Sequence, residues 1–147
     1  METITTSFKI CVDCADPHLL AAFWSAALGY DIEDHSPLIR HLLDAGAVGP
    51  DEVIEVDGRQ AFRAAAAIRD PAVAAPAVGQ GGRVLFQTVP ESKSVKNRLH
   101  LDLHVPDQAA TVARLVELGG SVTGHGEQGG HGWTVMADPE GNEFCVV

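Results

Sequence analysis

FKICVDCAD at residues 8–16 and LHLDLHVPD at residues 99–107 are the stretches that decide the fold. Both alternate apolar and polar residues, a pattern typical of a strand with one packed face. Both end in an aspartate that can cap the first turn of a helix, and apolar residues at helical spacing follow each of them. Glycines end the two predicted helices at Gly29 and at Gly119-Gly120. Strand, helix and glycine stop therefore recur about 90 residues apart, which indicates an internal repeat.

The remaining parts of the two halves correspond more loosely. Asp70-Pro71 matches Asp138-Pro139, and residues 83–87 match residues 142–145 as predicted strands. The repeat also places a strand at residues 64–68, although their alanines favour a helix.

Outside the repeated strands and helices, the sequence predicts one further helix and two loops. Residues 36–46 have apolar side chains at helical spacing and predict an extra helix in the first half. Residues 70–82, rich in alanine, proline and glycine, predict a floppy loop, and the glycine-rich residues 124–132 predict a mobile loop between strands.

A βαβββ unit that occurs twice predicts an α+β fold. We expect one domain over residues 1–147, built from modules at approximately residues 5–90 and 96–147. Its eight strands would form a cupped, mostly antiparallel sheet with helices on the outer face, and the two half-sheets would enclose a cavity. Phe8, Ile10 and Val12 should pack under the first helix. The polar residues that alternate with apolar ones, and should face the cavity, are Lys9, Cys11, Asp13, His100, Asp102 and His104.

Composition excludes several classes of protein. The chain has 147 residues, of which 46% are apolar, so it can bury a core without disulfides. A formal charge of −10 argues against nucleic acid and anionic membranes as partners. Three cysteines are too few for a disulfide framework, and the first residues lack the pattern of a secretory signal. We therefore expect a soluble, cytoplasmic protein with neither nucleic acid nor membrane as a partner.

The two strand–helix starts, which end near Phe23-Trp24 and Arg114-Leu115, together with residues 137–144 (ADPEGNEF), resemble the vicinal oxygen chelate superfamily, which includes glyoxalase I, extradiol dioxygenases and bleomycin-resistance proteins. Residues 89–103 (VPESKSVKNRLHLDL) look like a glyoxalase-like subgroup common in actinobacteria. The resemblance spans nearly the whole chain and implies the glyoxalase/bleomycin resistance/dioxygenase fold. Because superfamily members usually pair, it also implies a homodimer.

The resemblance further implies a metal site with one ligand from each of four strands, usually two histidines and two glutamates. In this chain those positions fall on Lys9, Gln87, His100 and Cys145, of which only His100 is a conventional ligand. A lysine ammonium has no lone pair to donate, and a neutral amide replaces a carboxylate poorly. We therefore expect no cofactor and no metal at the usual place. A divalent metal stays the minor alternative, since His100, Asp102 and Cys145 could form a different, softer site.

Three functions remain open. The first is binding of a small organic ligand in the cavity, in the manner of a bleomycin-resistance protein. The second is a lyase, isomerase or dioxygenase in which His100 is the acid/base or a metal ligand, Asp102 orients it, and Lys9 anchors an anion. The third is an interaction module with an acidic surface. The candidate ligand-binding residues are Lys9, Cys11, Asp13, Gln87, His100, Asp102, His104, Trp133 and Cys145.

Overall fold

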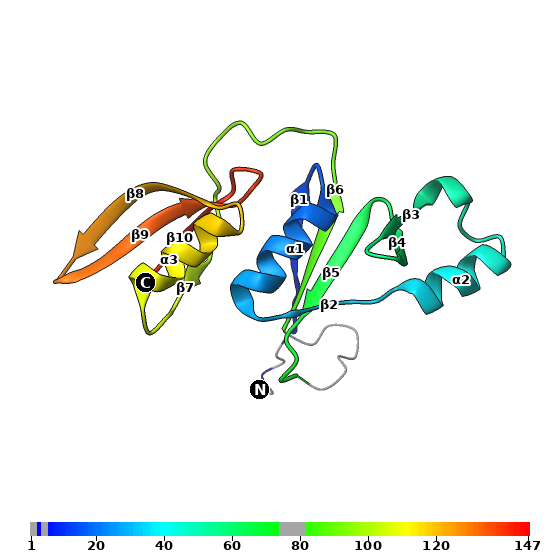
Figure 1. The fold of residues 1–147 in the computed structure, drawn as a ribbon, viewed down its shortest axis with the longest axis horizontal. Coiled ribbons are helices and arrows are strands. Elements are labelled where there is room, and N and C mark those ends of the chain that lie inside the picture. Colours follow the sequence, from blue (N-terminus) through cyan, green and yellow to red (C-terminus); the bar gives the residue numbers. More distant parts are fainter. Residues whose placement is uncertain (1–2, 4–5, 74–81) are drawn as a thin grey trace. The chain divides into compact units, whose positions relative to one another are not determined.

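The computed structural model describes residue 3, residues 6–73 and residues 82–147. The chain divides into two compact units, Met1–Pro90 and Glu91–Val147. Each unit contains a βαβββ-like module, so the predicted α+β fold with two such modules is confirmed (Figure 1). Among the described residues, no helix combines the length and the apolar character needed to cross a membrane.

Helix α1 (Pro17–Leu28) of the first unit begins and ends where the sequence predicts. The Asp16 carboxylate accepts hydrogen bonds from the backbone N–H groups of His18 and Leu19, each at 3.1 Å. Pro17 occupies the first turn, where no intrahelical donor is needed. Gly29 then adopts the left-handed conformation, with a φ of 71°, and stops the helix.

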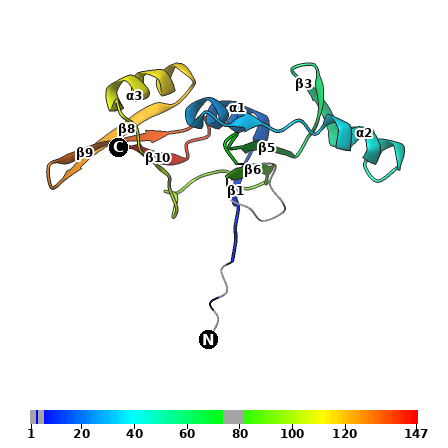
Figure 2. The same cartoon turned by 90° about the horizontal axis from the view of Figure 1, so that it is seen from below.

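The sheet of the first unit has the order β1-β6-β5-β2, with β1 (Ile10–Cys14), β2 (Asp31–Ile32), β5 (Ala65–Arg69) and β6 (Arg83–Thr88). β1 and β6 pair in parallel and the other pairs are antiparallel. Helix α1 packs against β5 and β6 on one face of this sheet (Figure 2). The strand expected at residues 64–68 is therefore confirmed as β5: burial of Ala66, Ala67 and Ile68 in the sheet overrides the helical preference of alanine.

Between β2 and β5 lie the predicted helix α2 (Ser36–Asp44), a short 3-10 turn (Pro50–Glu52) and a hairpin that the sequence analysis did not predict. The hairpin pairs β3 (Val53–Val56) with β4 (Arg59–Phe62). Its two-residue turn, Asp57-Gly58, has φ values of 49° and 78°. Asp-Gly favours such a turn because both residues tolerate positive φ.

The second unit contains β7 (Asp102–Leu103), α3 (Gln108–Glu117), β8 (Ser121–Gln128), β9 (His131–Ala137) and β10 (Glu143–Val146). Its sheet has the order β7-β10-β9-β8, in which β7 and β10 are parallel. The Asp107 carboxylate caps α3 by accepting the Ala110 N–H at 3.0 Å. Helix α3 packs on one face of β8, β9 and β10 (Figure 2).

Two predictions about local structure are wrong. Residues 124–132 are not a mobile loop but belong to the β8–β9 hairpin, whose turn is Gly129-Gly130 with φ values of 59° and 80°. Phe8 does not pack under α1: it precedes β1 and is 74% exposed, and Ile10 is 38% exposed. Helix α1 packs mainly on β5 and β6, which leaves the start of β1 uncovered. Of the predicted loop at 70–82, residues 74–81 lie outside the described residues.

Candidate functional site

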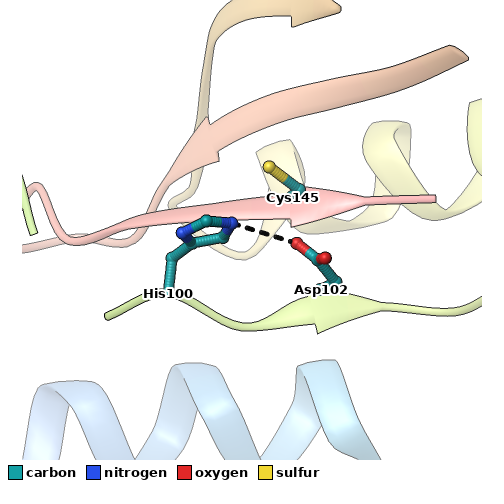
Figure 3. A group of neighbouring side chains, drawn as sticks. All are labelled: His100, Asp102 and Cys145. Carbon is teal, nitrogen blue, oxygen red and sulfur yellow. Dashed lines mark ion pairs between the residues drawn. The ribbon is translucent and has the colours of Figure 1, made fainter. Parts of the chain in front are cut away.

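His100, Asp102 and Cys145 come together in the second unit (Figure 3). Asp102 and Cys145 are direct partners in the parallel ladder between β7 and β10. His100 lies two residues before Asp102, so the alternation of an extended chain places both side chains on one face. His100 Nε2 is 3.3 Å from Asp102 Oδ1, and one nitrogen, oxygen or sulfur atom from each of the three lies within 4.8 Å of the others.

The charges around Cys145 disfavour a free thiolate. Burial and the neighbouring Asp102 carboxylate raise the pKa of the Cys145 thiol, although the positive charge of Lys96 acts in the opposite direction. The thiol is therefore protonated at neutral pH and is a poor nucleophile by itself. The His100 and Asp102 side chains are 44% and 51% exposed, so a molecule in solvent can reach the pair.

Lys96 was not among the predicted site residues. It is one of three basic residues between positions 93 and 98. The sequence signal for a role at the site is its place in this basic cluster, four residues before His100. The structure puts its charge close enough to act on the Cys145 thiol.

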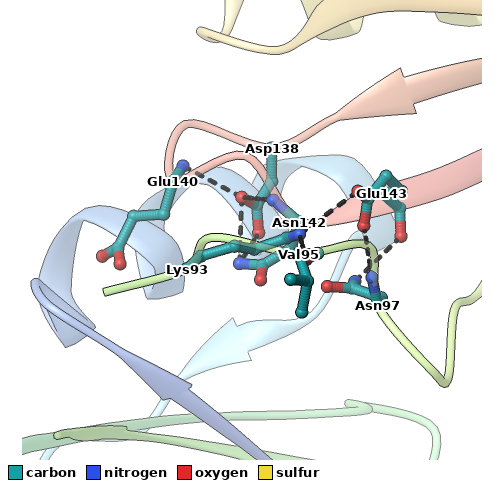
Figure 4. A network of polar contacts seen from close by, with 7 residues as sticks. All are labelled: Lys93, Val95, Asn97, Asp138, Glu140, Asn142 and Glu143. Atoms are coloured by element: carbon teal, nitrogen blue, oxygen red, sulfur yellow. Dashed lines mark hydrogen bonds and ion pairs between the residues drawn. The ribbon is translucent and has the colours of Figure 1, made fainter. Parts of the chain in front are cut away.

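Glu143 fixes the segment that leads to His100 (Figure 4). Its carboxylate accepts the Asn97 N–H at 2.9 Å and the Lys93 ammonium at 3.2 Å, while the Asn97 side-chain amide donates to the Glu143 carbonyl. The Asn97 N–H, with help from Lys93, lowers the pKa of Glu143 to about 2. Lys93 also donates to the Val95 carbonyl. This network ties residues 93–97 to the start of β10.

The turn before β10 depends on Asp138. This buried carboxylate accepts hydrogen bonds from the backbone N–H groups of Glu140 and Asn142 at 2.9 and 3.0 Å (Figure 4). It also accepts the Asn142 side-chain amide, at 2.9 and 3.1 Å. The Asp-Pro-Glu-Gly-Asn stretch thus shapes the turn that delivers β10, and with it Cys145.

Trp133 lies on β9, on the face of the sheet that points away from α3. The orientation follows from Thr134, whose hydroxyl donates to the Gln108 side chain of α3 at 2.8 Å. Val135 shares the face with Trp133 and is the ladder partner of Cys145. The indole lies against Gly126 of β8, where any added Cβ would overlap the ring atoms Cε2, Cζ2 and Nε1. Trp133 and the trio of His100, Asp102 and Cys145 therefore share one sheet face.

Four of the other predicted site residues, Lys9, Cys11, Asp13 and Gln87, lie in the first unit. Cys11 and Asp13 are exposed on β1, and Asp13 is the ladder partner of Gln87 on β6. The Gln87 amide donates to the Asp13 carboxylate at 3.1 Å. Lys9 is exposed just before β1.

His104 is exposed just after β7 in the second unit. Within the described part of the chain, His100, Asp102 and Cys145 are the one group of three or more His, Cys, Asp or Glu residues close enough to share a metal ion.

The comparisons with known proteins agree with this fold. A bleomycin-binding protein from Streptomyces verticillus, solved with copper(II)-bleomycin, is similar with a TM-score of 0.52 and 12% identity, over 99% of this chain and 98% of that one. A glyoxalase/bleomycin resistance/dioxygenase superfamily member from Sphaerobacter thermophilus gives a TM-score of 0.56 and 16% identity, over 98% and 97% of the two chains. A hypothetical protein from S. aureus gives 0.55 and 17%, over 98% and 94%. At these identities the likeness shows the fold alone.

No curated protein matches this sequence. The family model described as "Glyoxalase-like domain" matches residues 9–147. Because that match covers nearly the whole chain, the protein belongs to the glyoxalase-like domain family.

Proposed function

We propose that this protein binds a small organic ligand with an aromatic portion, and does so without the four-strand metal site implied by its superfamily. The observation that carries the proposal is the composition of the sheet face opposite α3 in the second unit. An indole and an aliphatic side chain, Trp133 and Val135, share this face with the polar pair His100 and Asp102. An apolar surface with a few convergent polar groups is the usual composition of a small-molecule site.

The chemistry at the four implied ligand positions supports the second half of the proposal. The Gln87 amide already donates to Asp13, so its nitrogen side is directed at a carboxylate. Lys9 would have to lose its proton before it could bind a metal. Two of the four positions therefore offer no anionic ligand to a hard cation.

The bleomycin-binding relative supports a binding role of the same general kind, since its structure contains copper(II)-bleomycin. A homodimer is part of the proposal, because superfamily members usually pair. The mass of the protein in solution, measured by light scattering during gel filtration, tests the homodimer separately.

The test measures the binding of a panel of aromatic compounds to chelator-treated protein. Calorimetry and quenching of tryptophan fluorescence both report the affinity. Trp133→Ala should weaken binding of any hit at least tenfold, because the indole supplies most of the apolar contact. His125→Ala is the matched control: His125 pairs with Thr134 across the same hairpin and belongs to the opposite face. Equal affinities for Trp133→Ala and the wild type would refute this site.

A second candidate function, acid/base catalysis, is favoured by the 3.3 Å contact between His100 and Asp102. A carboxylate beside an imidazole orients the ring and stabilises its protonated form. If the bound ligand is turned over, His100→Ala should abolish turnover and leave the fold intact. Unchanged turnover in that variant would exclude the catalytic role.

A further inference from the structure

The geometry of the trio matches what a zinc ion needs. In a tetrahedral site with Zn–N and Zn–O near 2.0–2.1 Å and Zn–S near 2.3 Å, ligand atoms are separated by about 3.3–3.6 Å. The His100 nitrogen and the Asp102 oxygen, at 3.3 Å, already have this separation. The largest separation in the trio is no more than 4.8 Å, so closure onto an ion requires a movement of about 1 Å. A small rotation of one side chain supplies such a movement.

The ligand chemistry also selects the metal. An imidazole nitrogen and a thiolate sulfur suit zinc, whereas magnesium and calcium prefer oxygen ligands only. A neutral imidazole, one carboxylate and one thiolate carry two negative charges, which match a divalent cation. The nearby positive charge of Lys96 offsets part of this attraction, but its side chain belongs to an exposed residue and is screened by water.

We propose that His100, Asp102 and Cys145 bind one zinc ion, with the fourth coordination position open to water or to an oxygen or nitrogen atom of a ligand. Binding displaces the proton from the Cys145 thiol to solvent, and the three ligands coordinate as a thiolate, a carboxylate and a neutral imidazole. Three protein ligands and one open position are the arrangement of catalytic rather than structural zinc sites.

This site differs from the one that the superfamily implies. It is built within one unit, from β7, the residues just before it, and β10. It shares the positions of His100 and Cys145 with the implied set, but its third ligand is Asp102, placed by its register with Cys145. It requires neither Lys9 nor Gln87, so the substitutions at those positions do not weaken it.

Calorimetric titration of the tag-free, chelator-treated full chain with ZnCl2 tests the proposal, with no organic ligand present. The wild type should bind one zinc ion per chain and release about one proton at pH 7, as measured in buffers of different ionisation enthalpy. Cys145→Ser and His100→Gln should each weaken zinc binding at least tenfold. Cys11→Ser and His104→Gln are the matched controls, since both replace exposed residues outside the trio and should bind zinc like the wild type.

A second measurement needs no variant and so does not depend on their folding. Iodoacetamide labelling followed by mass spectrometry should show that zinc protects Cys145, which is half-buried, and leaves the exposed Cys11 reactive. Cobalt in place of zinc should give a thiolate charge-transfer band that Cys145→Ser removes and Cys11→Ser retains. The proposal is overturned if zinc does not bind at one ion per chain, or if labelling of Cys145 is the same with and without zinc. Binding of the organic ligand is measured on chelator-treated protein, and zinc binding is measured with no organic ligand present. The proposed function and the zinc site can therefore fail independently of each other.

Discussion

Gly126→Ala should destabilise the protein by displacing Trp133, although a glycine inside a strand is ordinarily a weak point. At most strand positions alanine in place of glycine stabilises by about 0.4–1 kcal/mol, because it lowers the entropy of the unfolded chain. At Gly126 the new methyl group would overlap three atoms of the Trp133 indole. The ring has to move off the strand, and such overpacking costs about 1–3 kcal/mol. Subtracting the entropic gain leaves a net destabilisation of about 1–2 kcal/mol.

Gly124 is the matched control for this substitution. It lies on the same strand and the same face, two residues earlier, and an added Cβ there meets no atom within 4 Å. Gly124→Ala should therefore be neutral or slightly stabilising. Urea unfolding of the two variants gives the comparison, with the emission maximum of Trp133 as a second readout. Trp24, the other tryptophan, is buried in the first unit at 6% exposure and should emit as before. Equal stabilities and unchanged emission spectra in the two variants would refute the packing argument.

Three further predictions concern the scaffold. Arg83→Met should cost about 2 kcal/mol in the free energy of unfolding, because Arg83 donates two hydrogen bonds, at 2.6 and 3.1 Å, to the partly buried Glu33 carboxylate. Arg59→Met, at an exposed ion pair, should leave the free energy of unfolding nearly unchanged. Asp16→Ala should cost about 1 kcal/mol through loss of the α1 cap, measured by urea unfolding, and no loss would contradict the role of the cap. Because folding lowers the pKa of Glu143 from 4.5 to about 2, its contribution is fully present above pH 4.5 and lost as the pH falls toward 2. The melting temperature of Glu143→Gln should accordingly fall less than that of the wild type over this range, and parallel curves would argue against it.

The features predicted correctly from the sequence depend on contacts between near neighbours in the chain. Helix α1 is an example: Asp16 caps residues two and three positions later, and Gly29 stops the helix through its own backbone preference. The internal repeat also allowed β5 to be predicted as a strand, although its alanines alone favour a helix.

The β3–β4 hairpin and the turn of the β8–β9 hairpin have signals in the sequence. Asp57-Gly58 and Gly129-Gly130 each form a two-residue turn with positive φ at both positions. Such pairs between extended segments indicate a hairpin, but the high glycine content of residues 124–132 equally fits a mobile loop. What holds β8 in place is its ladder with β9 and the indole lying over Gly126, and neither contact has a signature within β8 itself.

The contacts that build the candidate site could be predicted only in part. Alternation places His100 and Asp102 on one face, and this much follows from the sequence. Their approach to Cys145 depends on the register between β7 and β10, which joins residues far apart in the chain. The roles of Lys96 and Glu143 depend on the path of the loop before β7, for which no periodic pattern exists.

The parallel pairing of the first and last strands in each unit has a consequence for the order of folding. The hairpins β3–β4 and β8–β9 join neighbours in the chain and should form within microseconds. The ladders β1–β6 and β7–β10 must first close long loops, so they should set the rate at which each sheet is completed. The loop closed by β1 and β6 is about 1.7 times as long as that closed by β7 and β10, a difference of about 0.5 kcal/mol in closure entropy. On this account the sheet that carries His100 and Cys145 is completed about twice as fast as the other.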